Sequence, residues 1–359
     1  MAHLSPAQLD RAVGTVIVSA AGDALGSAYE FGPALSDDVV PAFGRGHFGH
    51  AEREWTDDTS MAVPVLDELA AGRRLTDPVA LERIVSAWQG WARTALDVGA
   101  QTRHVLGRIP SPPTMDAIRT ASRATHDETG RSGGNGSLMR TGPVALGYLD
   151  RPADELTAAA AAVAQLTHWE DDNVDACALW CAAIRHGILT GELDMRGQLE
   201  VVPAERRDRW AALIDEALTP GTHPRAFSEA NGWVVRAFQG ALAAVAGATG
   251  PLDAIERAVR GGNDTDTVAA IAGSLAGAVW GAEALPASHR EGLHGWPGID
   301  GGELARRARV AVGVAEPGED GSLIETRHLL RSPENADRLL SALASARDGE
   351  TEEHELLEP

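Results

Sequence analysis

Helical periodicity dominates the pattern of apolar and polar positions along the chain. Apolar residues recur at three- and four-residue spacing, and the first such segment opens on the helix start signal Ser5-Pro6. Strand candidates such as 37–44 are few, short and interrupted by proline. The pattern therefore predicts an all-α fold. Its expected helical segments are 5–26, 61–72, 81–96, 114–125, 152–168, 173–191, 204–218, 231–248, 251–262 and 265–281.

The apolar pattern extends to about Val314, and no repeat of fixed period interrupts it. We therefore predict one large domain over residues 10–314. Residues 315–359 form an acidic C-terminal extension, with a linker at 315–322, one helix at 335–349 and an end that we expect to be mobile.

Composition narrows the classes of function. The formal net charge is −21, which disfavours general binding to nucleic acid or to anionic lipid. All 31 basic residues are Arg, and the absence of Lys excludes lysine Schiff-base chemistry. The N-terminus has no signal-peptide pattern, and the most apolar segment has about 15 residues, too few for a membrane span. We expect a cytoplasmic protein.

Two acidic, threonine-rich segments precede predicted helices. One carries Thr56, Asp57 and Asp58, and the other, some 200 residues later, carries Asp264, Asp266 and Thr267. Either could merely cap its helix and favour the helix dipole. If the two converge, they supply hard oxygen ligands that suit Mg²⁺ or Mn²⁺, and their four carboxylates would neutralise two divalent ions.

Small residues follow the second of these segments at a spacing of four. Gly273, Gly277 and Gly281 lie on one face of the expected helix, where neighbouring helices could approach closely and bury the site. The same spacing is also typical of tight helix packing alone.

A glycine-rich loop and a histidine are further candidates. Residues 130–140 could wrap a phosphate or ribose with backbone N–H groups, or form a plain turn, with Arg140 supporting the loop. His168 ends a helical run and is either structural or ligand-binding. Cys177 and Cys181, four apart on one helix, are expected to be ordinary core residues.

Taken together, these motifs resemble one family. The segments 22–31, 55–62, 134–140, 167–176 and 261–281 follow in the order and at the spacings of the ADP-ribosylglycohydrolase family, over roughly residues 10–312. The resemblance implies an all-α orthogonal fold with a binuclear Mg²⁺ or Mn²⁺ site. It also implies that the substrate is an ADP-ribosylated protein or an ADP-ribosyl small molecule.

The resemblance assigns roles to individual residues. The family's loop glutamate falls on Glu30 and its pocket histidine on His168. The acidic residues that follow His168 depart from the family pattern, so the resemblance does not identify the leaving group. The metal ligands fall on Thr56, Asp57, Asp58, Asp264, Asp266 and Thr267, and the ADP-ribose loop on Gly134, Asn135, Gly136 and Ser137.

The expected reaction is metal-dependent hydrolysis of the bond between ADP-ribose and a protein side chain, arginine first. Serine-linked, nucleic-acid-linked or small-molecule-linked ADP-ribose is the alternative substrate, and a catalytically silent ADP-ribose-binding protein is the alternative class. Proton transfer needs a carboxylate, which we assign to Glu30 or to a metal ligand such as Asp57 or Asp266.

Overall fold

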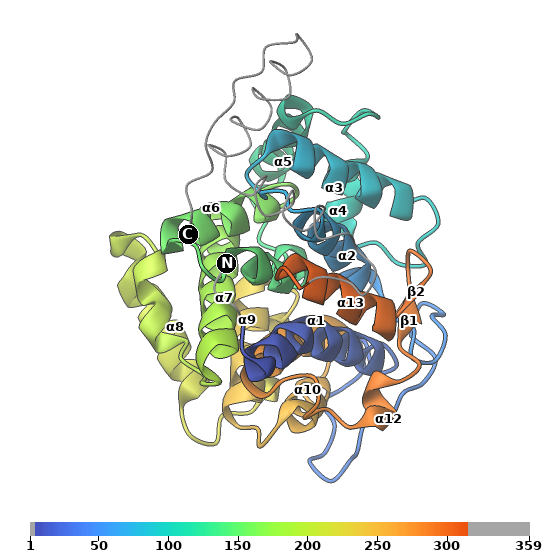
Figure 1. Ribbon diagram of the computed structural model, residues 1–359, viewed down its shortest axis with the longest axis vertical. Helices are drawn as coiled ribbons and strands as arrows, with labels where there is room; N and C mark the ends of the chain where they lie inside the picture. The colour runs from blue at the N-terminus through green and yellow to red at the C-terminus, as the bar shows by residue number, and fades with distance from the viewer. Residues whose placement is uncertain (1–3, 315–359) are drawn as a thin grey trace, which may run out of the picture.

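The computed structural model describes residues 4–314, and these form one bundle of crossing helices, so the predicted all-α fold is confirmed (Figure 1). The C-terminal extension lies outside the described residues, so its predicted linker and helix stay predictions. The α-helices are α1 Pro6–Gly26, α2 Asp57–Ala70, α3 Pro78–Trp91, α4 Ala100–Leu106, α5 Met115–Thr129, α6 Ala153–Ala164, α7 Asp171–Thr190, α8 Ala204–Leu218, α9 Val234–Ala246, α10 Pro251–Val259, α11 Thr265–Trp280, α12 Ala287–Arg290 and α13 Gly301–Ala311.

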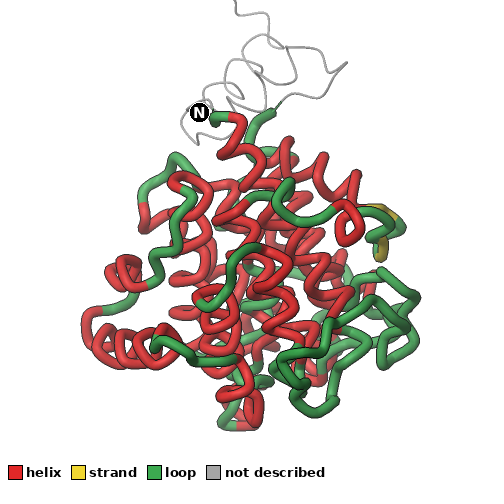
Figure 2. The backbone as a smooth tube through the Cα atoms, turned by 90° about the horizontal axis from the view of Figure 1, so that it is seen from below, coloured by secondary structure: helices red, strands yellow, loops and turns green. Residues whose placement is uncertain are grey.

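The remaining regular elements are short. Within the described residues, four 3₁₀ helices join the α-helices, and His294 to Asp300 form an antiparallel hairpin in which Gly295 pairs with Ile299. The sequence pattern did not indicate this hairpin, while the strand candidate 37–44 is a loop with Val40 exposed. The 3₁₀ helices are η1 Asn135–Ser137, η2 Gly142–Tyr148, η3 Arg196–Val201 and η4 Pro224–Ala230, and the strands are β1 His294–Gly295 and β2 Ile299–Asp300. Long loops gather on one side of the molecule (Figure 2).

Helix α1 occupies the centre of the bundle, between α13 and α10 in Figure 1, and packs most closely against α11. Glycines make this approach possible. A β-carbon on Gly277 would lie 2.0 Å from the carbonyl oxygen of Gly14, and one on Gly22 would lie 2.3 Å from that of Ala269. Real side chains never approach backbone atoms so closely, so both positions require glycine.

The same contact continues to the ends of the two helices. A β-carbon on Gly26, the last residue of α1, would lie 2.4 Å from the Cα atom of Asp266 in the first turn of α11. The C-terminal end of α1 is thus pressed against the N-terminal end of α11. This packing brings residues near 23–30 to the acidic start of α11.

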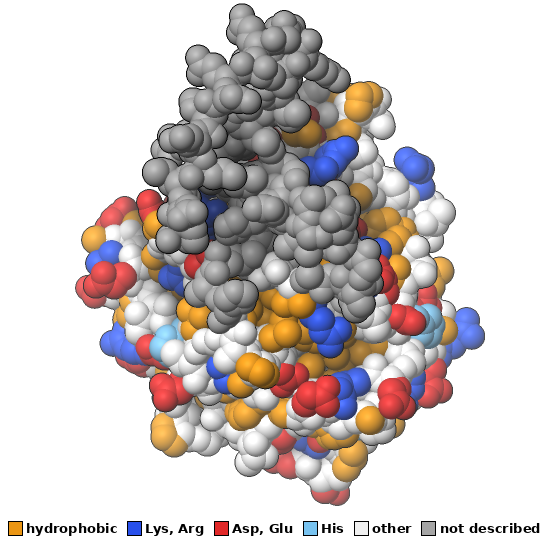
Figure 3. Space-filling model, viewed as in Figure 1, with side chains coloured by type: hydrophobic (Ala, Val, Ile, Leu, Met, Phe, Trp, Pro, Cys, Tyr) orange, Lys and Arg blue, Asp and Glu red, His pale blue; other side chains and the backbone are white. Residues whose placement is uncertain are grey.

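The surface is mixed in charge. On the face shown in Figure 3, acidic, basic and hydrophobic side chains are interspersed. No helix among residues 4–314 combines the length and the apolar character needed to cross a membrane.

Candidate functional site

Asp23 fixes the start of α2. Its Oδ1 accepts hydrogen bonds from the backbone N–H and the hydroxyl of Thr56, both at 2.8 Å. Its Oδ2 accepts from the N–H and the hydroxyl of Thr59, at 3.0 and 2.6 Å. Asp23 is fully buried, and burial raises its pKa while the four hydrogen bonds lower it in part. Asp23 therefore caps α2 from another helix, in a role that the sequence analysis did not assign.

The two acidic segments meet in space. Burial raises the pKa values of Asp57, Asp58 and Asp266 well above the ordinary range, and other carboxylates add to the effect. For Asp266 in α11 the largest electrostatic contribution comes from Asp58 in α2, followed by Asp264. Like charges act so strongly on one another only when they are close and poorly screened. The helix starts of α2 and α11 therefore form one carboxylate cluster: Asp57, Asp58, Asp264 and Asp266.

One oxygen of this cluster lacks a partner. Asp58 Oδ1 is buried and has no hydrogen-bond partner among the described residues. Within residues 4–314, however, no three His, Cys, Asp or Glu side chains are placed closely enough to hold a metal ion as they stand. The cluster is therefore electrostatically frustrated but not already arranged around an ion.

The glycine loop is joined directly to the carboxylate cluster. The side-chain amide of Asn135 donates to Asp264 Oδ2 at 2.7 Å and to the carbonyl of Asn231 at 2.9 Å. Residues 135–137 form the single-turn helix η1 rather than an open loop. Ser137 faces away from the site, because it is fully buried and its Oγ accepts a hydrogen bond from Asn173 at 2.7 Å.

A cavity of about 760 Å³ lies over the cluster. Thr56, Asp58 and Ser137 lie behind its surface, and Gln101 and Asp97 contribute to its wall although the sequence pattern did not indicate them. The candidate residues that line it are Glu30, Asp57, Gly134, Asn135, Gly136, His168, Asp264, Asp266 and Thr267. Most of the predicted site residues, the carboxylates and the glycine loop among them, therefore line one cavity.

His168 is neutral and supports the glycine loop. It lies beyond the end of α6, its Nδ1 is 2.7 Å from the hydroxyl of Thr167, and burial holds its pKa well below the usual range, with Arg140 adding to the effect. A β-carbon on Gly134 or Gly136 would lie 3.2 Å from the His168 ring. The two glycines thus let the loop pack on the imidazole, which is the closest neighbour of both positions.

Arg140 holds the segment that precedes His168. Its side chain is fully buried, donates to the Thr167 hydroxyl at 2.8 Å and to the carbonyl of Val163 at 3.1 Å, and lies 4.2 Å from the centre of the Trp88 ring. Burial lowers its pKa to about 9. The guanidinium therefore holds the segment that leads to His168, whereas the sequence analysis expected it to support the glycine-rich loop.

Glu30 lies at the rim of the cavity and is half-buried. Burial raises its pKa to about 8, and the charges of Asp264 and Asp97 contribute next. The backbone around it is pinned: the N–H of Phe31 donates to the carbonyl of Asn263 at 2.6 Å, and Asn263 donates back to Gly32 at 2.8 Å. Glu30 is thus tied to the start of α11, although glycine and proline flank it.

Comparison with known proteins identifies the family of this chain. The sequence matches ADP-ribosylglycohydrolase over residues 4–318. The chain belongs to the ADP-ribosylglycohydrolase family. It is therefore a glycohydrolase that acts on a glycosidic bond to ADP-ribose, as predicted.

Relatives of this glycohydrolase support the assignment. It is 31% identical to ADP-ribosylarginine hydrolase Tri1 of Pseudomonas putida, over 79% of this chain and 74% of that protein. It is 27% identical to ADP-ribosyl-[dinitrogen reductase] glycohydrolase of Rhodospirillum rubrum, over 78% of this chain and 89% of that protein. A solved structure titled ADP-ribosylglycohydrolase-related protein complex superposes with a TM-score of 0.64 at 26% identity, covering 85% of this chain and 98% of that chain.

Proposed function

We propose that this glycohydrolase releases ADP-ribose from modified arginine side chains of proteins, with two divalent cations, Mg²⁺ or Mn²⁺, held by the carboxylate cluster. One observation carries the proposal: the acidic starts of α2 and α11 meet at a cavity of about 760 Å³ that the glycine loop also lines. The similarity to ADP-ribosylarginine hydrolase supports arginine as the leaving group.

The residues present fit a hard divalent cation. The candidate donors are carboxylate and hydroxyl oxygens, which Mg²⁺ and Mn²⁺ prefer. The unpartnered Oδ1 of Asp58 and the mutually raised pKa values are what a cation would relieve. The ligands would be Thr56, Asp57, Asp58, Asp264, Asp266 and Thr267, after side-chain rotations from the arrangement described. Bound cations would supply positive charge that polarises the ribose hydroxyls and a water molecule.

The glycine loop would bind the phosphate side of the substrate. Gly134 and Gly136 present backbone without side chains to the cavity, and backbone N–H groups are suitable donors to phosphate oxygens. The neutral His168 behind them adds no charge and fixes their position. Asn135 couples the two ends of the site through its hydrogen bond to Asp264.

Glu30 is our first candidate for proton transfer. When the bond between the ribose anomeric carbon and the guanidine nitrogen breaks, the nitrogen takes up a proton and water supplies the new carbon–oxygen bond. Because Glu30 lines the cavity and has a raised pKa, it can hold a proton near neutral pH and exchange it with the reacting groups. Asp57 and Asp266 also line the cavity and remain the alternative candidates.

A panel of defined substrates tests the proposal. Purified protein is incubated with matched peptides that carry ADP-ribose on arginine or on serine, and free ADP-ribose is quantified. We expect release from the arginine peptide with Mg²⁺ or Mn²⁺ and none after exhaustive dialysis against EDTA. Release from the serine peptide alone would assign the other linkage. Release from neither peptide would contradict the proposal and leave nucleic-acid-linked or small-molecule-linked ADP-ribose as the substrate.

A further inference from the structure

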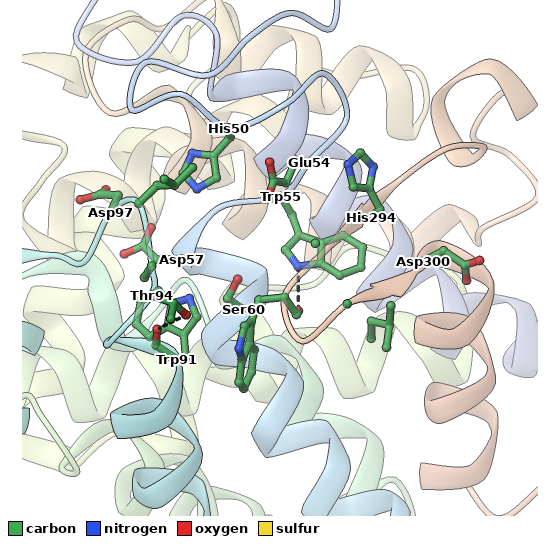
Figure 4. Close-up of a pocket in the computed structure, with 16 residues that line it drawn as sticks. His50, Glu54, Trp55, Asp57, Ser60, Trp91, Thr94, Asp97, His294 and Asp300 are labelled. Carbon is green, nitrogen blue, oxygen red and sulfur yellow. Dashed lines mark hydrogen bonds between the residues drawn. The ribbon is translucent and has the colours of Figure 1, made fainter.

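A second cavity, of about 570 Å³, opens beside the first. It lies between the end of α3 and the β1–β2 hairpin, and Asp57 and Asp97 line both cavities (Figure 4). The two volumes therefore meet at the carboxylate cluster. A substrate cleaved at this junction would have one product on each side.

Three tryptophans line the second cavity. Trp55 and Trp91 are buried, Trp296 is half-exposed, and the indole N–H of Trp55 donates to the carbonyl of Trp296 at 3.1 Å. This bond holds the hairpin against the start of α2. Rigid indole faces at a cavity surface are the preferred stacking partners of a guanidinium.

The ionisable side chains of this cavity favour a cation. Carboxylates lie along it from Asp57 and Asp97 at one end to Asp300 at the other, with Glu54 between them (Figure 4). Among the described residues that line it none is arginine, and the chain contains no lysine. A guanidinium entering here would meet aromatic faces and carboxylates without a competing cation.

An unsatisfied polar group also points to a ligand. His50 lines the cavity, is only 7% exposed, and its buried Nδ1 has no hydrogen-bond partner among the described residues. Figure 4 shows its ring beside Asp97 and Asp57 at the inner end of the cavity. A buried ring nitrogen without a partner is costly, and a polar group of a ligand would satisfy it.

We propose that this cavity receives the leaving group: the side chain of the modified arginine stacks on Trp296 and pairs with Asp97, and the flanking peptide continues toward Asp300. The inference rests on the proposed function, because it takes the larger cavity as the site of ADP-ribose. A serine side chain carries no charge and could not form this ion pair with Asp97. The second cavity is therefore what makes the enzyme selective for arginine, and Asp97 and Trp296 are specificity-determining residues.

The test uses Asp97→Asn and Trp296→Ala, with Asp208→Asn on the exposed face of α8 as the matched control. Initial rates are measured on an ADP-ribosyl-arginine peptide with arginine amide or citrulline amide as competitor, and ADP-ribose affinity is measured by calorimetry. Arginine amide should inhibit the wild type and Asp208→Asn, and the neutral citrulline amide should not. Both cavity variants should weaken this inhibition and raise KM for the peptide by about tenfold or more. Trp296→Ala, at a residue that lines the second cavity and not the first, should also keep wild-type ADP-ribose affinity.

Two different failures are distinguishable. A wild-type enzyme inactive on the arginine peptide would overturn the proposed function and this inference with it. Suppose instead that the wild type is active and that arginine amide inhibits Asp97→Asn and Trp296→Ala as strongly as it inhibits the wild type. This result would overturn only the assignment of the cavity. So would equal inhibition by citrulline amide, because the cavity would then not recognise charge.

Discussion

The side-chain amide of Asn135 donates a hydrogen bond of 2.7 Å to Oδ2 of Asp264, and so joins the glycine loop to the carboxylate cluster. The two residues are 129 positions apart in the chain. Burial raises the pKa of Asp264, and this hydrogen bond is the largest influence that lowers it. A movement of the loop is therefore transmitted to a predicted metal ligand, and binding at the two ends of the cavity should be coupled.

Gly136→Val tests whether the glycine loop takes part in binding ADP-ribose. A β-carbon at Gly136 would lie 3.2 Å from His168, so a branched side chain must displace the imidazole or the loop. We expect ADP-ribose affinity, measured by calorimetry, to fall by about tenfold or more, while Mn²⁺ binding persists. Gly250→Val is the control, since a β-carbon there meets nothing within 4 Å. Wild-type affinity in Gly136→Val would remove the loop from the binding site.

Asp23→Ala tests how the start of α2 is held. The substitution removes the acceptor of four hydrogen bonds from Thr56 and Thr59 and leaves their donors buried. We expect the free energy of unfolding in urea, measured in EDTA, to fall by about 3 kcal/mol. Asp116→Ala, at an exposed position in the first turn of α5, should change it by no more than about 0.5 kcal/mol. Equal effects of the two substitutions would contradict the role of Asp23.

The pH dependence of Tm, measured without substrate, tests whether the carboxylates of the cluster repel one another. A carboxyl group whose pKa is higher in the folded state than in the unfolded state stabilises the fold fully below its unfolded pKa, and that contribution is lost as pH rises through the folded pKa. The pKa of Glu30 is raised from 4.5 to about 8, and those of Asp57, Asp58 and Asp266 are raised as well. In EDTA we therefore expect Tm to fall between about pH 4.5 and pH 8.

Excess Mn²⁺ should flatten this dependence, because a cation would compensate the ionised carboxylates. Asp266→Asn should raise Tm in EDTA near pH 8, since it removes one of the repelling charges. A Tm in EDTA that rises over the same pH range would show that the cluster is not electrostatically frustrated.

Sequence patterns were sufficient to predict the helical fold and the two acidic helix starts, because capping residues and helical periodicity are local signals. The glycines at 273 and 277 likewise indicated the close approach of a neighbouring helix, which proves to be α1. The family resemblance was needed to place Glu30 and His168, since neither stands out by its local pattern.

Other features depend on contacts between distant segments. Asp23 is one polar residue in an apolar helix, and its hydrogen-bond partner Thr56 is 33 residues away in the chain. Nothing local shows that Ser137 faces Asn173 instead of the cavity. The second cavity is lined by three separate segments, 50–60, 91–97 and 294–300, so no single motif could have indicated it.

Glu30→Gln separates proton transfer from binding. The substitution keeps the shape of the side chain and removes its ability to exchange a proton. We expect turnover of the arginine peptide to fall by about 100-fold or more while ADP-ribose affinity is retained. Glu229→Gln, at an exposed position in η4, is the control and should keep wild-type turnover. Unchanged turnover in Glu30→Gln would leave Asp57 and Asp266 as the candidates.

The most direct test of the account is the rate of ADP-ribose release from an ADP-ribosyl-arginine peptide by wild type and by Asp266→Asn, each with saturating Mg²⁺ or Mn²⁺ and each in EDTA. The account predicts release by the wild type only with the cation, and a loss of about 100-fold or more in Asp266→Asn, which remains folded because it relieves repulsion in a buried cluster. Wild-type rates in Asp266→Asn, or undiminished release in EDTA, would contradict it.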